Sequence, residues 1–182
     1  MAEVENNNLI AEVECLIRNV PDFPKPGINF KDITPVLSRP AVFRKIVEFF
    51  ATGAGDGVDA VIGVESRGFL FGTMLAEKLN VPFIPVRKQG KLPYKTISHA
   101  YDLEYGQAVV EMHHDVLKSG ERVLIHDDLL ATGGTAVAAA KLAEMMGATV
   151  VGFCFVIELE YLKGREKLLP ISSNIISIVN YK

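Results

Sequence analysis

Apolar residues recur at helical spacing in two stretches near the start of the chain. The first stretch covers residues 9–20 and predicts an amphipathic helix. The second begins near Pro40, and proline is favoured in the first turn of a helix. The residues of this second helix that are expected to face inward are Val42, Phe43, Ile46, Val47 and Phe50. Between the two helices, residues 21–27 contain three prolines, so we expect regular structure to be interrupted there.

From residue 58 onward, short continuous apolar runs alternate with helical patterns. Such runs are typical of strands that are covered on both faces, and their alternation with helices favours right-handed crossovers between parallel strands. We therefore predict an α/β fold, a mostly parallel sheet with helices on both faces. A polar stretch and two extended segments that fit a β-hairpin interrupt the pattern between residues 87 and 112. The expected strands are residues 58–65, 81–86, 122–126, 149–159 and 175–179, and the expected helices are residues 68–79 and 135–147.

The composition is that of a globular protein. Of 182 residues, 49% are hydrophobic and 23% are charged, which predicts a single domain over residues 1–182 with a sizeable core. No apolar run approaches the roughly 20 residues that cross a bilayer. The acidic, polar N-terminus matches neither a secretion signal nor a transit peptide. These features predict a cytoplasmic protein with no membrane partner.

Charge and cysteine content argue against two further classes of protein. The net charge of −3 gives no overall basic field, so we expect no nucleic-acid partner. Cys15 and Cys154 lie far apart in apolar stretches and form neither a Cys-x-x-Cys pair nor a group with a histidine. We interpret both as buried thiols. Any anionic ligand must therefore be bound by a local group of residues.

Residues 123–135 are the most informative stretch of the sequence. An apolar strand ends there in two aspartates and passes through a loop of small residues into a helix. Backbone N–H groups at a helix N-terminus bind phosphate, and small residues let the phosphate approach them. Asp127 and Asp128 can accept hydrogen bonds from two vicinal ribose hydroxyls. The residues expected to hold the phosphate of this ribose phosphate site are Thr132, Gly133, Gly134 and Thr135.

Other interpretations of this loop fit less well. The loop lacks the Gly-Lys-Ser/Thr ending of a P-loop and the glycine spacing of a dinucleotide site. A plain strand-to-helix turn with solvated acids is the alternative. Adjacent aspartates at the end of a buried strand are costly to place without partners, which favours the ligand site.

The pattern Asp-Asp-x-x-Ala-Thr-Gly-Gly-Thr at residues 127–135 resembles the phosphoribosyl diphosphate (PRPP) motif of the type I phosphoribosyltransferases. The stretches that resemble the adenine-specific branch of this family are residues 23–34, 65–72, 87–93 and 101–106. Their order and spacing also match. The resemblance implies a type I phosphoribosyltransferase-like fold with a small N-terminal hood at about residues 21–37 and a mobile basic loop at about residues 87–106.

The resemblance also implies a reaction. The enzyme would transfer the 5-phosphoribosyl group of PRPP to N9 of adenine, giving AMP and diphosphate in purine salvage. Mg²⁺ would arrive with PRPP rather than occupy a dedicated protein site. Members of the family are usually homodimers, so a homodimer is expected by analogy.

Several residue roles come from the resemblance. Ala131 would join the residues that hold the 5-phosphate, and the peptide between Glu65 and Ser66 would be strained and cis. The residues implied for diphosphate are Glu65, Ser66, Arg67, Arg87, Lys88 and Lys91. Without the resemblance, Arg67 also fits a surface salt bridge, and the basic loop fits a solvated segment.

A second group of residues is implied for the base. Asn29, Phe30 and Lys31 match the hood, in which an aromatic ring covers adenine and main-chain groups read its edge. Many members carry Arg where this chain has Lys31, so the match there concerns the main chain. Glu104 matches the carboxylate that handles the proton of the base. Taken alone, Phe30 also fits a core residue and Glu104 an ordinary acid at a strand end.

Two alternative functions stay open from the sequence. One is a phosphoribosyltransferase for hypoxanthine, guanine or xanthine, and the hood together with Glu104 argues against it. The other is a PRPP-sensing regulator that binds nucleic acid, which would need an added module or a basic face.

His126 is interpreted as structural because strand alternation points it away from the side of Asp127. The histidines interpreted as surface or packing residues are His99, His113 and His114.

Overall fold

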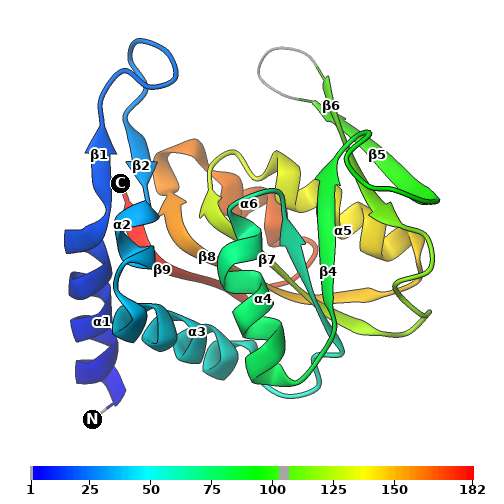
Figure 1. Cartoon of the computed structure of the whole chain (residues 1–182), viewed down its shortest axis with the longest axis horizontal. Coiled ribbons are helices and arrows are strands. Elements are labelled where there is room, and N and C mark those ends of the chain that lie inside the picture. Colours follow the sequence, from blue (N-terminus) through cyan, green and yellow to red (C-terminus); the bar gives the residue numbers. More distant parts are fainter. Residues whose placement is uncertain (1, 103–106) are drawn as a thin grey trace.

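The computed structural model describes residues 2–102 and 107–182. A seven-stranded sheet has the order β5-β6-β4-β3-β7-β8-β9, and β1 and β2 form a separate antiparallel pair (Figure 1). The strands are β1 (Arg18–Val20), β2 (Phe30–Asp32), β3 (Ala60–Val64), β4 (Phe83–Lys88), β5 (Thr96–Asp102), β6 (Gln107–His113), β7 (Arg122–Leu130), β8 (Thr149–Leu159) and β9 (Ile175–Tyr181). The helices are α1 (Ala2–Leu16), α2 (Thr34–Leu37), α3 (Pro40–Ala54), α4 (Gly68–Leu79), α5 (Gly134–Met145), the 3₁₀ turn η1 (Glu160–Leu162) and α6 (Gly164–Leu168).

The centre of the main sheet is parallel. β3 pairs in parallel with β4 on one side and with β7 on the other, and β8 and β9 continue the parallel arrangement. β5 and β6 form an antiparallel hairpin that adds to the sheet beside β4. The predicted α/β fold is therefore confirmed, and the hairpin extends the sheet.

Three details differ from the sequence predictions. The helix expected over residues 9–20 ends at Leu16, because residues 18–20 pair with β2. The strand expected to end at residue 126 continues as β7 to Leu130, so the two aspartates lie within the strand. Cys154 is buried as expected, but Cys15 is exposed. Cys15 lies on the outward side of α1, whereas Leu9 and Val13 supply the buried side of this helix.

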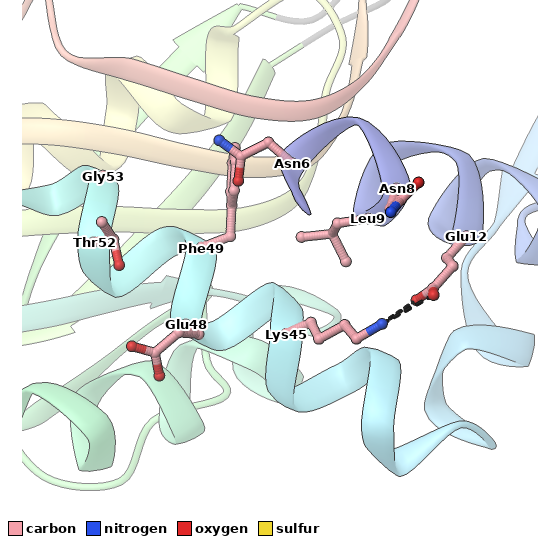
Figure 2. Close-up of a pocket in the computed structure, with 9 residues that line it drawn as sticks. All are labelled: Asn6, Asn8, Leu9, Glu12, Lys45, Glu48, Phe49, Thr52 and Gly53. Carbon is pink, nitrogen blue, oxygen red and sulfur yellow. Dashed lines mark hydrogen bonds and ion pairs between the residues drawn. The ribbon is translucent and has the colours of Figure 1, made fainter. Parts of the chain in front are cut away.

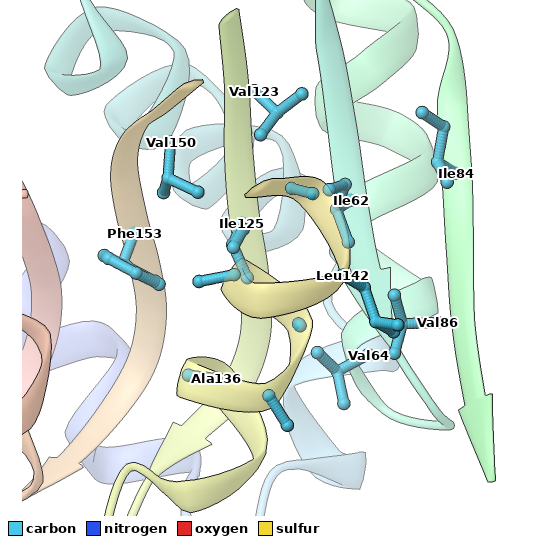
Figure 3. Close-up of a cluster of buried hydrophobic side chains, with 14 of the residues drawn as sticks. Ile62, Val64, Ile84, Val86, Val123, Ile125, Ala136, Leu142, Val150 and Phe153 are labelled. Carbon is cyan, nitrogen blue, oxygen red and sulfur yellow. The ribbon is translucent and has the colours of Figure 1, made fainter. Parts of the chain in front are cut away.

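Apolar side chains pack against both faces of the sheet. On one face, α5 and α6 cover the centre of the sheet, where Leu142 of α5 packs in one cluster with Ile62 and Ile125 (Figure 3). On the other face lie α1, α3 and α4, whose residues Phe50 and Phe71 are fully buried. Within the described ranges, no helix is long and apolar enough to cross a membrane.

The strand order brings together segments that are distant in sequence. β3, β4 and β7 are neighbours and parallel, so their carboxyl ends lie at one edge of the sheet. Residues 65–67 follow β3, Arg87 and Lys88 end β4, and residues 131–133 follow β7. Because ligands of open α/β sheets bind at this edge, the fold places the predicted motifs where a shared site can form.

Candidate active site

The turn after β3 is tied to the end of β4. Arg87 Nη2 donates a hydrogen bond to Glu65 Oε1 over 2.9 Å, and the backbone N–H of Lys88 donates to Glu65 Oε2 over 2.9 Å. The hydrogen bond from Arg87 holds the pKa of the Glu65 carboxyl below its ordinary value. The peptide between Glu65 and Ser66 is cis, as the resemblance implied. The sheet thus joins two segments that the sequence analysis linked to diphosphate.

Arg67 connects the separate parts of the site. Its Nε lies 3.1 Å from Asp128 Oδ2, and its guanidinium carbon lies 4.9 Å from the centre of the Phe30 ring. The Nη1 atom of Arg67 is buried and has no hydrogen-bond partner among the residues that the structure describes. A buried donor without an acceptor costs free energy, so this atom is suited to an incoming oxygen of a ligand.

Asp127 and Asp128 are neighbours in β7, where Asp128 is buried and Asp127 is half-buried. The side chain of Asp127 accepts a hydrogen bond of 2.8 Å from the backbone N–H of Asp128. Burial raises the pKa of Asp127 well above its ordinary value, and the negative charge of Asp128 raises it further. Burial also raises the pKa of Asp128, while Arg67 opposes this shift. Hydroxyl donors from a sugar would favour the charged form of the pair.

Gly68, the first residue of α4, lets that helix begin directly against β7. A Cβ atom at this position would lie 2.8 Å from the carbonyl oxygen of His126 and 3.1 Å from Asp127 Oδ1. Any larger residue would therefore push α4 away from the aspartates. The close approach keeps the turn that carries Arg67 beside the carboxylates of β7.

The loop from residue 131 to residue 133 leads directly into α5. Gly133 adopts a φ of +78°, a conformation that favours glycine, and its backbone packs against the backbone of Gly164. At the start of α5, the hydroxyl of Thr135 lies 3.2 Å from the hydroxyl of Tyr101 on β5. The N-terminus of α5 therefore lies at the carboxyl edge of the sheet, a few residues after the two aspartates.

The hood residues are divided between the site and the framework. The half-buried Phe30 ring packs edge-on against Phe23, with 5.2 Å between the ring centres. Lys31 Nζ donates to Asn19 Oδ1 over 2.6 Å and lies 3.8 Å from the centre of the Tyr181 ring. The Lys31 side chain is thus engaged by β1 and β9. Asn29 is exposed, and Glu104 lies outside the described residues.

His126 lies in β7 just before the two aspartates, and its ring packs against residues of α3 and α4. It is fully buried, and its ring centre lies 5.3 Å from that of Phe50 and 6.2 Å from that of Phe71. Its Nδ1 lies 2.9 Å from the carbonyl oxygen of Cys154. The interpretation of His126 as a structural residue is confirmed.

Acid is expected to destabilise the protein through His126. Burial lowers the pKa of its imidazole to about 4, whereas an unfolded histidine titrates near about 6.5. Between these two pH values, the unfolded chain binds a proton that the folded chain excludes. As the pH falls from about 6.5 to about 4, this residue alone should lower the free energy of unfolding by roughly 3 kcal/mol. Urea unfolding of wild type and His126→Leu over this range measures the effect.

The slope of the free energy of unfolding against pH separates this titration from a packing defect. His126→Leu should flatten the pH dependence even if it changes the stability at neutral pH. His114→Gln, at an exposed histidine, serves as the matched control and should leave the slope as in wild type. Equal slopes in wild type and His126→Leu would show that His126 does not titrate in this way.

A groove elsewhere on the molecule contains none of the predicted site residues. It lies between α1 and α3, where Lys45 Nζ donates to both carboxylate oxygens of Glu12, over 2.9 and 2.8 Å (Figure 2). The residues that line it are Asn6, Asn8, Leu9, Glu12, Lys45, Glu48, Phe49, Thr52 and Gly53. The convergence of motifs at the carboxyl edge of the sheet, rather than this groove, therefore defines the candidate active site.

The comparisons with known proteins agree with this arrangement. The family model described as phosphoribosyl transferase domain matches residues 36–181. The adenine phosphoribosyltransferase of Christiangramia forsetii is 54% identical over 158 residues, covering 86% of this chain and 92% of that protein. The chain belongs to the adenine phosphoribosyltransferase family. It is therefore a phosphoribosyltransferase with the fold of that family.

Solved structures of family members superpose closely on this phosphoribosyltransferase. The enzyme from Thermoanaerobacter pseudethanolicus is 48% identical, with a TM-score of 0.90 over 94% of this chain and 99% of that one. The enzyme from Saccharomyces cerevisiae, solved with adenine and an imino-altritol bisphosphate, is 39% identical, with a TM-score of 0.84 over 89% of this chain and 95% of that one.

Some contacts that hold the site in place could not be predicted from the sequence. Glu111 is buried on β6 and accepts a hydrogen bond of 2.9 Å from the backbone of Gly90. The Tyr101 hydroxyl and the Gly164 backbone are also next to the loop of the predicted 5-phosphate site. No local pattern distinguishes these residues, because each contact joins segments that only the sheet brings together.

Proposed function

We propose that this enzyme transfers the 5-phosphoribosyl group of PRPP to N9 of adenine and releases diphosphate, giving AMP. A bond forms between N9 and C1 of the ribose, the bond between C1 and the diphosphate oxygen breaks, and the base loses a proton. The observation that carries the proposal is the position of Arg67 between Asp128 and the Phe30 ring. The relative from Saccharomyces cerevisiae, solved with adenine, supports the choice of base.

Asp127 and Asp128 orient the ribose, and residues 131–135 hold its 5-phosphate. The carboxylates accept hydrogen bonds from the vicinal hydroxyls, which fixes the face of C1 that the base attacks. The groups proposed for the 5-phosphate are the backbone N–H groups and hydroxyls of Ala131, Thr132, Gly133, Gly134 and Thr135. Their place at the start of α5 supports this role, since a helix N-terminus favours negative charge.

The cationic side chains stabilise the departing diphosphate. Two buried donors, Arg67 Nη1 and Arg87 Nε, have no hydrogen-bond partner within the described ranges, which supports an anionic ligand between them. Lys88, the last residue of β4, and Lys91, in the turn that follows, are exposed. We propose that this basic segment closes over the bound substrates and excludes water. Glu65 and Ser66 supply the turn that presents Arg67.

The hood holds the base, and Glu104 handles its proton. Phe30 stacks on adenine, while Asn29 and the main chain of Lys31 read its edge. The engagement of the Lys31 side chain by Asn19 and Tyr181 supports a main-chain role for this residue. Glu104 accepts or relays the proton that the base loses as N9 attacks C1.

Magnesium is proposed to enter the site with PRPP. Carboxylate oxygens suit Mg²⁺, but Arg67 already engages Asp128 Oδ2, and the described residues contain no group of three possible ligands. These residues fit a metal that is held mainly by substrate oxygens, near Asp127 and Asp128. When bound, the ion would neutralise charge on the diphosphate.

A homodimer and a cytoplasmic location complete the proposal. The dimer is proposed by analogy, because members of the family are usually homodimers. Light scattering of the purified protein, which measures its mass in solution, would test the first. Microscopy of a tagged full-length chain would test the second.

A base-selectivity assay tests the proposed reaction. Purified protein with Mg²⁺ and PRPP is supplied with adenine, hypoxanthine or guanine in turn, and the nucleotide and diphosphate formed are measured. We expect AMP and diphosphate in equal amounts from adenine and little product from the other bases. Equal rates with hypoxanthine would overturn the assigned base specificity, and no nucleotide from any base would overturn the reaction itself.

A further inference from the structure

An ion pair between a buried carboxylate and a partly exposed arginine lies outside the residues assigned to substrates. Glu158 on β8 is 3% exposed, and Arg165 on α6 pairs with both of its carboxylate oxygens, with Nε 2.9 Å from Oε1. Ser177 on β9 donates to Oε2 of Glu158 over 2.6 Å. Arg165 Nη1 also donates to the carbonyl oxygen of Ile175 over 3.0 Å. Together these bonds join α6 to β8 and to β9.

The charge on this buried carboxylate is maintained by its partners. Burial acts to raise the pKa of Glu158, but hydrogen bonds from Arg165 and Ser177 outweigh it and hold the pKa below its ordinary value. A forked pairing between guanidinium and carboxylate fixes both groups in one geometry. Pairing a buried charge is often no more stabilising than placing an apolar residue of similar size there, so stability alone does not account for the charge on Glu158.

The residue next to Arg165 contacts the loop proposed to hold the 5-phosphate. Gly164 begins α6, and a Cβ atom on it would overlap the carbonyl oxygen of Ala131 and lie 3.0 Å from the Gly133 nitrogen. In the reverse direction, a Cβ atom on Gly133 would lie 2.8 Å from the Gly164 carbonyl oxygen. The two backbones are therefore in direct contact, and a shift of α6 must move the loop or open a gap beneath it.

We propose that Glu158 and Arg165 are positioning residues for PRPP, which set the place of the 5-phosphate loop by holding Gly164 against it. This inference rests on the proposed function of residues 131–135. Arg165 follows Gly164, whose backbone lies directly against the loop, and Glu158 pairs across the sheet with Leu130, the residue before the loop. Loss of the pair therefore weakens the grip on the ribose phosphate and leaves the hood around Phe30 unchanged.

Three substitutions test this chain of contacts. Arg165→Met and Glu158→Gln remove the forked pairing, and Gly164→Ala acts on the loop directly while leaving the ion pair in place. Lys45→Met is the matched control, because it removes an ion pair with Glu12 that is exposed and lies between α1 and α3, away from the site (Figure 2).

The measurements separate positioning from stability. For each full-length variant we would determine the KM for PRPP, the KM for adenine, the Kd for ribose 5-phosphate by calorimetry, and Tm. Ribose 5-phosphate carries the 5-phosphate but neither the base nor the diphosphate, so it reports on the loop. All kinetic measurements are made well below the lowest Tm.

We expect Arg165→Met and Gly164→Ala to raise the KM for PRPP and the Kd for ribose 5-phosphate by about 10- to 100-fold, since a misplacement of about 1 Å can cost this much. The KM for adenine should stay within about twofold of wild type, as should every constant of Lys45→Met. Glu158→Gln, which keeps the shape of the side chain, should have a smaller effect in the same direction.

Two outcomes overturn the inference. If the variants lower Tm but leave the Kd for ribose 5-phosphate unchanged, the pair only stabilises the fold. If the constants for PRPP and adenine change by the same factor, the pair does not act through the loop. Failure of the proposed function looks different, because the wild-type protein would then make no AMP from adenine and PRPP.

Discussion

Arg67→Met is expected to lower kcat/KM for PRPP by about 10²- to 10³-fold, the size of effect seen when one preorganised donor to a developing charge is removed. The guanidinium contacts both Asp128 and the Phe30 ring, and its Nη1 is a buried donor that lacks a partner within the described ranges. Methionine keeps much of the side-chain volume but removes the charge and the donors. Initial rates with both substrates varied would measure the loss.

Two further variants make the Arg67 experiment specific. Arg67→Lys keeps the positive charge but loses the planar fork, so its activity should lie between those of wild type and Arg67→Met. Arg44→Met removes an exposed arginine from α3 and should leave kcat/KM unchanged. The assigned role of Arg67 is wrong if Arg67→Met keeps the wild-type kcat/KM for PRPP while remaining folded.

Glu104→Ala should lower kcat by about 10²- to 10³-fold, within the usual contribution of a general acid or base. The role assigned to Glu104 is transfer of the proton that adenine loses, so PRPP affinity should change by no more than about threefold. Single-turnover rates at saturating substrates, together with the Kd for PRPP, would separate the two effects.

The pH dependence gives an independent test of Glu104. A titrating carboxylate should impose an acid limb on the kcat profile of wild type, and Glu104→Gln, which cannot titrate, should lack that limb. Glu77→Ala, at an exposed carboxylate on α4, is the control and should keep the wild-type profile. Wild-type turnover by Glu104→Ala would rule out the proposed role.

Much of the architecture follows from local patterns in the sequence. Continuous apolar runs separated by helical periodicity are sufficient to predict a parallel sheet covered on both faces, because only that arrangement buries both sides of each strand. His126 is a single-residue example: alternation along the strand predicted a structural role, and the structure shows its ring packed against Phe50 and Phe71.

Local patterns failed where a distant partner decided the conformation. Residues 18–20 carry a helical pattern, yet they form β1 because Phe30–Asp32 offers a strand to pair with. In the same way, β7 extends past His126 to Leu130 because β8 continues beside it. Tertiary pairing outweighs the small differences in local propensity that separate a helix end from a strand start.

The sequence by itself determined the α/β class, the order of the motifs and, through the PRPP motif, the family to which the chain belongs. Only the tertiary structure decided which motifs meet: Arg67 with Asp128 and Phe30, Arg87 with Glu65, and Gly164 with the loop before α5. The reason is physical. Motif chemistry is encoded in adjacent residues, whereas these contacts depend on strand order and on close backbone packing, which arise only when distant segments bury their apolar faces together.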